Sequence, residues 1–154
     1  MADIRDALPL LGPDVIDVLR RPEFVARPPL QVRAALPELQ REFRGVPVLT
    51  GSGDGPDVRL ALYGDLSEAM TCEARNALTA LSAALDAVQR GVPTVPGRLV
   101  LVDNGRVLHG RWPFRPAFDG RDRWLQRGMV TSSLRPWQAW QRDSLRVLTP
   151  QASQ

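Results

Sequence analysis

A short, uninterrupted apolar run, Leu-Val-Leu-Val at 99–102, is the feature that most constrains the fold of this chain. A strand whose side chains are all apolar is covered on both faces, so we expect 99–102 to be a central strand. Asn104-Gly105 then indicates a turn, because this pair tolerates the positive φ angles of a type I′ hairpin. The pattern predicts a second short strand over 106–108, which ends at His109, the only histidine of the protein.

A polar loop rich in proline and arginine follows over 111–122 and leads into another extended segment that begins at Arg123. Alternate residues of a strand share a face, so the side chains of Arg123 and Arg127 would point the same way. The guanidinium group is planar, permanently charged and suited to bind a carboxylate through two parallel hydrogen bonds.

The segment His109–Arg127 reads HGRWPFRPAFDGRDRWLQR and resembles the C-terminal signature of the clavaminate synthase-like oxygenases. These iron(II)- and 2-oxoglutarate-dependent enzymes hydroxylate or desaturate amino acids and related substrates, and they include asparagine and arginine β-hydroxylases. The resemblance implies that His109 is an iron ligand and that Arg123 binds the distal carboxylate of 2-oxoglutarate. It also implies that Arg127 holds a carboxylate of the substrate, and that Fe(II) and 2-oxoglutarate are the cofactors.

In that family the other two iron ligands come from a His-X-Asp/Glu motif that lies well upstream, and this chain has no second histidine. The core of the resemblance covers 46–135, which implies the C-terminal portion of a double-stranded β-helix, or jelly roll. Such a portion exposes unpaired strand edges that favour association. We therefore expect an amino-acid-like small-molecule substrate, and a partner that is either an N-terminal half polypeptide or a second copy of the chain.

The expected fold class is mostly β with flanking helices, an α+β arrangement in a single domain over 1–154. Its first part, 1–45, reads as a helical, proline-rich lead-in to the core. The last residues, 147–154, read as a frayed tail.

Local signals predict several elements. Two short helices should be separated at Gly12-Pro13, because proline suits the first turn of a helix. A strand, a glycine-rich turn and a second strand are predicted over 46–63. The clearest helix has Thr71 as its N-cap and ends before Gly91. Its apolar stripe comprises Ala74, Leu78, Leu81, Leu85 and Val88.

Composition excludes several classes of protein. The chain is 44% hydrophobic and 24% charged, as is usual for globular proteins. All 20 basic residues are arginines, but they are scattered and the net charge is only +3, which does not indicate a nucleic-acid surface. The apolar runs are too short to cross a membrane, and the single Cys72 fits a reducing compartment. We expect a cytoplasmic protein and assign no role to Cys72.

Three functions remain open at this point. The first is the C-terminal portion of an iron(II)/2-oxoglutarate-dependent oxygenase for an amino acid or a derivative of one. The second is a non-catalytic module that keeps the two arginines as a carboxylate site. The third is a structural partner of a full-length oxygenase that pairs through the edge of its sheet.

Overall fold

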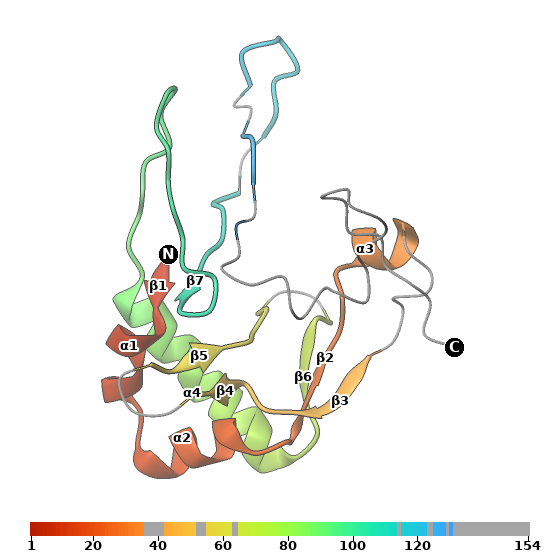
Figure 1. Ribbon diagram of the computed structural model, residues 1–154, viewed down its shortest axis with the longest axis vertical. Coiled ribbons are helices and arrows are strands. Elements are labelled where there is room, and N and C mark those ends of the chain that lie inside the picture. The colour runs from red at the N-terminus through yellow and green to blue at the C-terminus, as the bar shows by residue number, and fades with distance from the viewer. Residues whose placement is uncertain are drawn as a thin grey trace, which may run out of the picture.

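The computed structural model describes residues 1–35, 42–51, 55–62, 65–113, 115–122, 125–128 and 130. Helices and short antiparallel sheets form a body, from which two long arms project in the same direction (Figure 1). We call 91–106 the first arm and the described residues within 110–128 the second arm. Within the described residues, none of the helices has the length and hydrophobicity needed to span a membrane.

The N-terminal helices are separated at Gly12-Pro13, as predicted. After β1 (Ala2–Asp3), α1 (Ile4–Ala7) is capped by Asp3, whose carboxylate accepts a hydrogen bond of 2.9 Å from the backbone N–H of Arg5. The 3-10 helix η1 (Leu8–Leu10) follows, and α2 (Pro13–Arg20) starts at the predicted proline. The prediction of two short helices around Gly12-Pro13 is confirmed.

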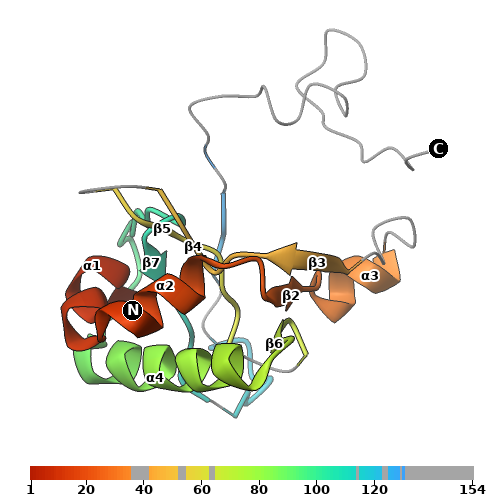
Figure 2. The same ribbon diagram turned by 90° about the horizontal axis from the view of Figure 1, so that it is seen from below.

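Helix α4 (Cys72–Val88) supports the body from one side. Thr71 is its N-cap, as predicted, because its hydroxyl accepts a 3.0 Å hydrogen bond from the backbone N–H of Ala74. The same hydroxyl donates to a carboxylate oxygen of Glu23 at 2.7 Å, which ties the start of the helix to the segment before β2. Helices α1 and α2 lie along α4, as Figure 2 shows. The buried residues of α4 are Ala74, Ala77, Leu81, Ala84 and Leu85.

Three small antiparallel sheets complete the body. The central one has the order β3-β2-β6, from β2 (Phe24–Ala26), β3 (Phe43–Val46) and β6 (Ser67–Ala69), with α3 (Leu30–Ala35) between β2 and β3 in the chain. Strands β4 (Leu49–Thr50) and β5 (Asp57–Val58) confirm the predicted strand, turn and strand, in a shorter form. The last sheet joins β1 to β7 (Val107–Leu108).

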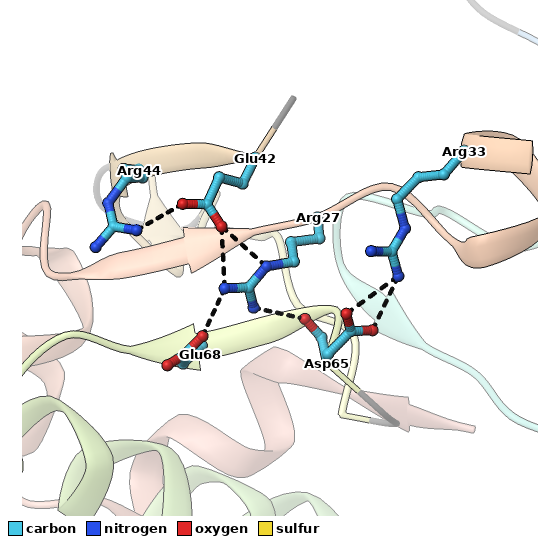
Figure 3. A network of polar contacts seen from close by, with 6 residues as sticks. All are labelled: Arg27, Arg33, Glu42, Arg44, Asp65 and Glu68. Carbon is cyan, nitrogen blue, oxygen red and sulfur yellow. Dashed lines mark hydrogen bonds and ion pairs between the residues drawn. The ribbon is translucent and has the colours of Figure 1, made fainter. Parts of the chain in front are cut away.

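An ionic network fastens the central sheet (Figure 3). The guanidinium of Arg27, next to the end of β2, donates to Glu68 of β6 at 2.6 Å and to Glu42, just before β3, at 3.0 Å. It also donates to the backbone carbonyl of Asp65 at 2.9 Å. Hydrogen bonds from Arg44 and then Arg27 lower the pKa of the Glu42 carboxyl below its ordinary value. One side chain thus bridges all three strands of the sheet.

The predicted strand over 99–102 is not formed, and this prediction is wrong for the described structure. The strand that ends before His109 does form as β7, but its partner is β1. The turn that precedes β7 is closed by the N–H groups of Arg106 and Val107, which donate to the carbonyl of Asp103 at 3.1 and 2.9 Å. Gly105 has no positive φ, so the turn is not type I′. β7 pairs with a strand that is distant in sequence.

Helices with antiparallel sheets agree with the α+β prediction, but the described strands are short and do not close a barrel. Helix α4 has 17 residues, whereas the longest strand, β3, has 4, so the described part is less rich in strand than expected. The division into one domain with a lead-in over 1–45 stays a prediction. The predicted tail, 147–154, lies outside the described residues.

Candidate metal and carboxylate site

Among the predicted site residues, His109 is the one whose backbone position is set by a strand of the body, β7. It comes immediately after β7. The last residue of that strand, Leu108, pairs with Ala2 and is a partly buried residue that packs against the hydrophobic core. The N–H of Ile4 donates to the carbonyl of Arg106 at 2.9 Å and extends this attachment. The imidazole is exposed, and within the described residues it has no hydrogen-bond partner. His109 is therefore held by its backbone, with its side chain available for a ligand.

His109 lines a cavity of about 870 Å³. Small-molecule sites in proteins occupy roughly 300–1,000 Å³, so this space suits a small ligand. The wall opposite β7 is the segment that follows β5, including Arg59, Leu60 and Leu62, and the C-terminal half of α4 contributes Leu85. The cavity thus combines apolar walls with the few polar groups typical of a ligand site.

Arg59 is a cavity residue that the sequence reading did not single out. Its side chain lines the same cavity as His109, and its backbone N–H is held by the carbonyl of Val48 at 2.9 Å. Arg27 also lines the cavity, but its guanidinium is committed to the ionic network. The available signal was a lone arginine in the otherwise apolar stretch 58–62.

The described residues do not fit a complete iron site. Non-haem iron of this type requires two histidines and one carboxylate on one face. The chain has one histidine, and no group of three or more His, Cys, Asp or Glu that could hold a metal is found among the described residues. Asp57 and Asp86 line the cavity with His109, but the three do not converge into a metal cluster. His109 is at most one ligand of a site completed by other groups.

Of the two predicted carboxylate-binding arginines, the structure describes only Arg127. Arg123 lies outside the described residues. Arg127 is described and exposed, and it is not among the residues that line the cavity. The described residues 125–128 have no regular secondary structure, so the strand expected there is not found. The roles of both arginines stay predictions.

The second arm contains a turn that precedes both arginines in the sequence. The carboxylate of Asp122 accepts hydrogen bonds from the backbone N–H groups of Ala117 at 3.0 Å and Phe118 at 2.7 Å. These two bonds, the one from Ala117 first, lower the pKa of the Asp122 carboxyl below its ordinary value. Phe118 has a φ of 55°, a left-handed conformation that is uncommon for an aromatic residue. The carboxylate of Asp122 thus stabilises a bend just before Arg123.

Comparison with known proteins identifies the relatives of the chain. No family model matches the sequence. The chain is 40% identical to the L-asparagine oxygenase of Streptomyces coelicolor over 134 residues, which are 87% of this chain and 38% of that protein. It is 51% identical to clavaminate synthase 2 of Streptomyces clavuligerus over 53 residues, 34% of this chain and 16% of that protein. The chain thus spans less than half the length of the curated relatives it matches.

Solved structures give the same result. The chain superposes on asparagine oxygenase in complex with Fe(II), 2S,3S-3-hydroxyasparagine and succinate with a TM-score of 0.87 and 37% identity, over 97% of this chain and 45% of the other. It superposes on the non-heme iron oxygenase OrfP in complex with Fe with a TM-score of 0.73 and 34% identity, over 92% of this chain and 44% of the other. These similarities show that the chain resembles part of the clavaminate synthase-like iron oxygenases, and the partial coverage fits a C-terminal portion.

Proposed function

We propose that this chain is the C-terminal portion of an iron(II)- and 2-oxoglutarate-dependent oxygenase that acts on an amino acid or a derivative of one. The observation that carries the proposal is the superposition of 97% of the chain on an asparagine oxygenase that holds Fe(II), a hydroxylated amino acid and succinate. Succinate is the product that 2-oxoglutarate gives when it loses carbon dioxide and gains one oxygen atom from dioxygen. Other relatives are named as hydroxylases of arginine, ornithine and lysine, which supports an L-amino acid as the substrate class.

The residue roles are those that the resemblance implies, and the chemistry of the side chains supports them. His109 supplies one imidazole nitrogen to the iron, at the edge of a cavity large enough for an amino acid. Arg123 binds the distal carboxylate of 2-oxoglutarate and Arg127 binds a carboxylate of the substrate, because a guanidinium pairs with a carboxylate through two parallel hydrogen bonds. The metal is the group that activates oxygen in such enzymes, and these residues position it and the two carboxylates.

Under this proposal, the catalytic activity belongs to the complete oxygenase, in which this chain is joined by the groups that supply the other iron ligands. The described residues offer one imidazole and no metal cluster, so the other iron ligands come from outside them. An iron centre with a single protein imidazole would bind the metal weakly, because affinity grows with the number of ligands.

We also propose that the protein is cytoplasmic, since its one cysteine, Cys72, is free and exposed and suits a reducing compartment.

The test is a chimera in which this chain replaces the matched region of the S. coelicolor L-asparagine oxygenase. With Fe(II), 2-oxoglutarate and oxygen, we expect succinate to form when a panel of L-amino acids is offered that includes asparagine, arginine, ornithine and lysine. His109→Ala should abolish succinate formation while circular dichroism stays unchanged. A folded chimera that forms no succinate with any of these amino acids, or one that is indifferent to His109→Ala, would refute the proposal.

A matched pair of variants tests the substrate arginine. Arg127→Ala should raise the KM for the amino acid, because it removes a charge-assisted contact to a carboxylate. Arg121→Ala, at another exposed arginine of the second arm, should not change it. Equal KM values for the two variants would contradict the role given to Arg127.

A further inference from the structure

The turn over 103–106, which leads directly into β7, is held together by its first residue, Asp103. The backbone carbonyl of Asp103 accepts the N–H groups of Arg106 and Val107. Its carboxylate adds a second set of contacts. Oδ1 accepts a 3.1 Å hydrogen bond from the N–H of Gly105, and Oδ2 lies 3.6 Å from Nε of Arg106. Asp103 therefore folds the turn with both its main chain and its side chain.

The folded turn is attached to the body on two sides. The carbonyl of Gly105 accepts a 2.7 Å hydrogen bond from the N–H of Val58 in β5, and the carbonyl of Arg106 accepts one of 2.9 Å from the N–H of Ile4 in α1. Both donor residues are buried in the hydrophobic core. Because the two carbonyls belong to neighbouring residues, a change in the conformation of the turn would break at least one of these bonds.

Charged side chains accompany this attachment along the ladder of β1 and β7. The hydrogen bond from Arg5 is the largest cause of the lowered pKa of Asp3, and the positive charge of Arg106 adds a smaller contribution. Arg106 thus pairs with Asp103 in the turn and also acts on Asp3 in β1. The side chains of the Arg106 and Asp103 pair are 37% and 63% exposed, and exposed pairs contribute little by themselves. The hydrogen bonds of the turn therefore carry most of the attachment.

The position of His109 depends on this turn because its strand has few other anchors. Strand β7 has two residues, and in the described part of the chain its ladder partner is β1, which also has two (Figure 1). On the other side of His109, none of the described residues of 110–128 is buried. A displacement of the turn would thus pass through three residues to the imidazole at the edge of the cavity.

We propose that Asp103 is a positioning residue for His109: its carboxylate, as the acceptor of the Gly105 N–H, folds the turn that fixes where β7 and the imidazole stand. The proposal rests on the function proposed above, in which His109 binds iron, and it concerns residues of this chain alone. A ligand that is already held in place loses less freedom when it binds. Groups that orient the ligands of a metal change its affinity by about 10- to 100-fold when they are removed.

Two substitutions separate the acceptor from the charge. Asp103→Ala removes the acceptor of the Gly105 N–H, whereas Asp103→Asn keeps an oxygen at that place and loses the charge. In the chimera described above, Asp103→Ala should raise the Kd for Fe(II), measured without oxygen and without 2-oxoglutarate, by about 10-fold or more. Asp103→Asn should restore most of the affinity. An unchanged Kd in Asp103→Ala would overturn the proposal, and so would equally weak binding by both variants, which would assign the effect to the ion pair.

The second arm offers a matched control. Oδ1 of Asp119 accepts a 2.9 Å hydrogen bond from the N–H of Arg121, the same contact over two residues that Asp103 makes with Gly105. Asp119→Ala should leave the Kd for Fe(II) of the chimera unchanged, because its turn does not lead into β7. Equal losses of affinity in Asp119→Ala and Asp103→Ala would contradict a role specific to the turn before β7.

Amide hydrogen exchange in the isolated chain tests the attachment without any metal. In Asp103→Ala, the amides of Ile4 and Val58, which donate to the turn, should lose protection. The amide of Leu81 in the middle of α4 should keep its protection. Equal loss at all three amides would mean that Asp103 supports only the overall stability of the fold, and this would overturn the proposal. The measurement also decides the proposal where the chimera does not fold.

The two proposals fail in different ways. A chimera that binds Fe(II) with an affinity that depends on Asp103, but forms no succinate, would keep the positioning role and refute the catalytic function. A chimera that forms succinate in a His109-dependent manner, with the same Kd for Fe(II) in Asp103→Ala, would keep the function and refute the positioning role.

Discussion

Asp3 and Val107 lie opposite each other in the antiparallel ladder of β1 and β7. Because His109 comes two residues after Val107, the position of the candidate iron ligand depends on the first residues of the chain. Asp3 also begins α1, since its carboxylate binds both the backbone N–H and the guanidinium of Arg5. One residue thus connects the capping of the first helix with the placement of the site.

The cap at Asp3 leads to a prediction about stability. Asp3→Ala should lower the free energy of unfolding by about 1 kcal/mol, the usual cost of losing an N-cap side chain. Asp17→Ala, at an exposed position in α2, should have a much smaller effect. Urea denaturation followed by circular dichroism measures both, and equal losses would show that the cap does not contribute.

The same carboxyl predicts a dependence on pH. The hydrogen bond from the Arg5 side chain, the largest cause, lowers the pKa of Asp3 in the folded protein. A lowered pKa means that the stabilisation is fully present above the pKa of the unfolded chain, about 3.9, and is lost as pH falls through the folded value. The stability difference between the wild type and Asp3→Ala should therefore shrink below pH of about 4. A difference that is constant down to acid pH would contradict this.

The bend of the second arm should also respond to acid. Because backbone hydrogen bonds lower the pKa of Asp122, the bend should persist in the range where free aspartates become protonated and open only at lower pH. The amide proton shifts of Ala117 and Phe118 in NMR spectra report the two bonds. Asp122→Ala should abolish their pH dependence, and a titration retained in that variant would assign it to another group.

Burial predicts a large loss of stability when one leucine is replaced by alanine and a small loss when another is replaced. Leu81 is fully buried in α4, so Leu81→Ala should cost about 2–5 kcal/mol of stability through lost contacts and a cavity. Leu101 is 87% exposed, so Leu101→Ala should lower the free energy of unfolding of the isolated chain by less than about 0.5 kcal/mol. Urea midpoints measure both. A large loss at Leu101 would mean that the first arm already packs against something in the isolated chain.

Iron binding should depend on assembly. The isolated chain should show no visible charge-transfer band when Fe(II) and 2-oxoglutarate are added without oxygen, because one imidazole does not make a site for both. The chimera should show the band, and His109→Ala should remove it. A band from the isolated chain would mean that ligands beyond the described residues, or a second copy, complete the site.

Short-range signals in the sequence account for the local elements. Thr71 and Pro13 mark the starts of α4 and α2 because a cap and a first-turn proline act within one helical turn. The strands around the turn over 51–57 were also predictable, since a hairpin joins neighbours in the chain. The family was recognisable from His109–Arg127, and the similarity to known oxygenases confirms it.

Pairings over long distances in the sequence were not predictable in the same way. The pattern at 106–108 required a partner strand, and the neighbouring 99–102 was the natural choice, yet β7 pairs with β1. Arg27 is one of many arginines in the sequence, and its contacts with Glu42 and Glu68 arise only when the segments that carry them meet in the fold. The same holds for Arg59, which lines a cavity with His109 although the two residues are distant in the sequence.

The sequence by itself determined where α2 and α4 begin and which family the segment from His109 onward resembles. The tertiary structure decided which strand accompanies His109, which residues line its cavity, and that Leu99 and Leu101 are exposed within the described chain. The physical reason is the range of the interactions. Caps and turns act between neighbours, whereas strand pairing and burial depend on which distant segments are present to meet.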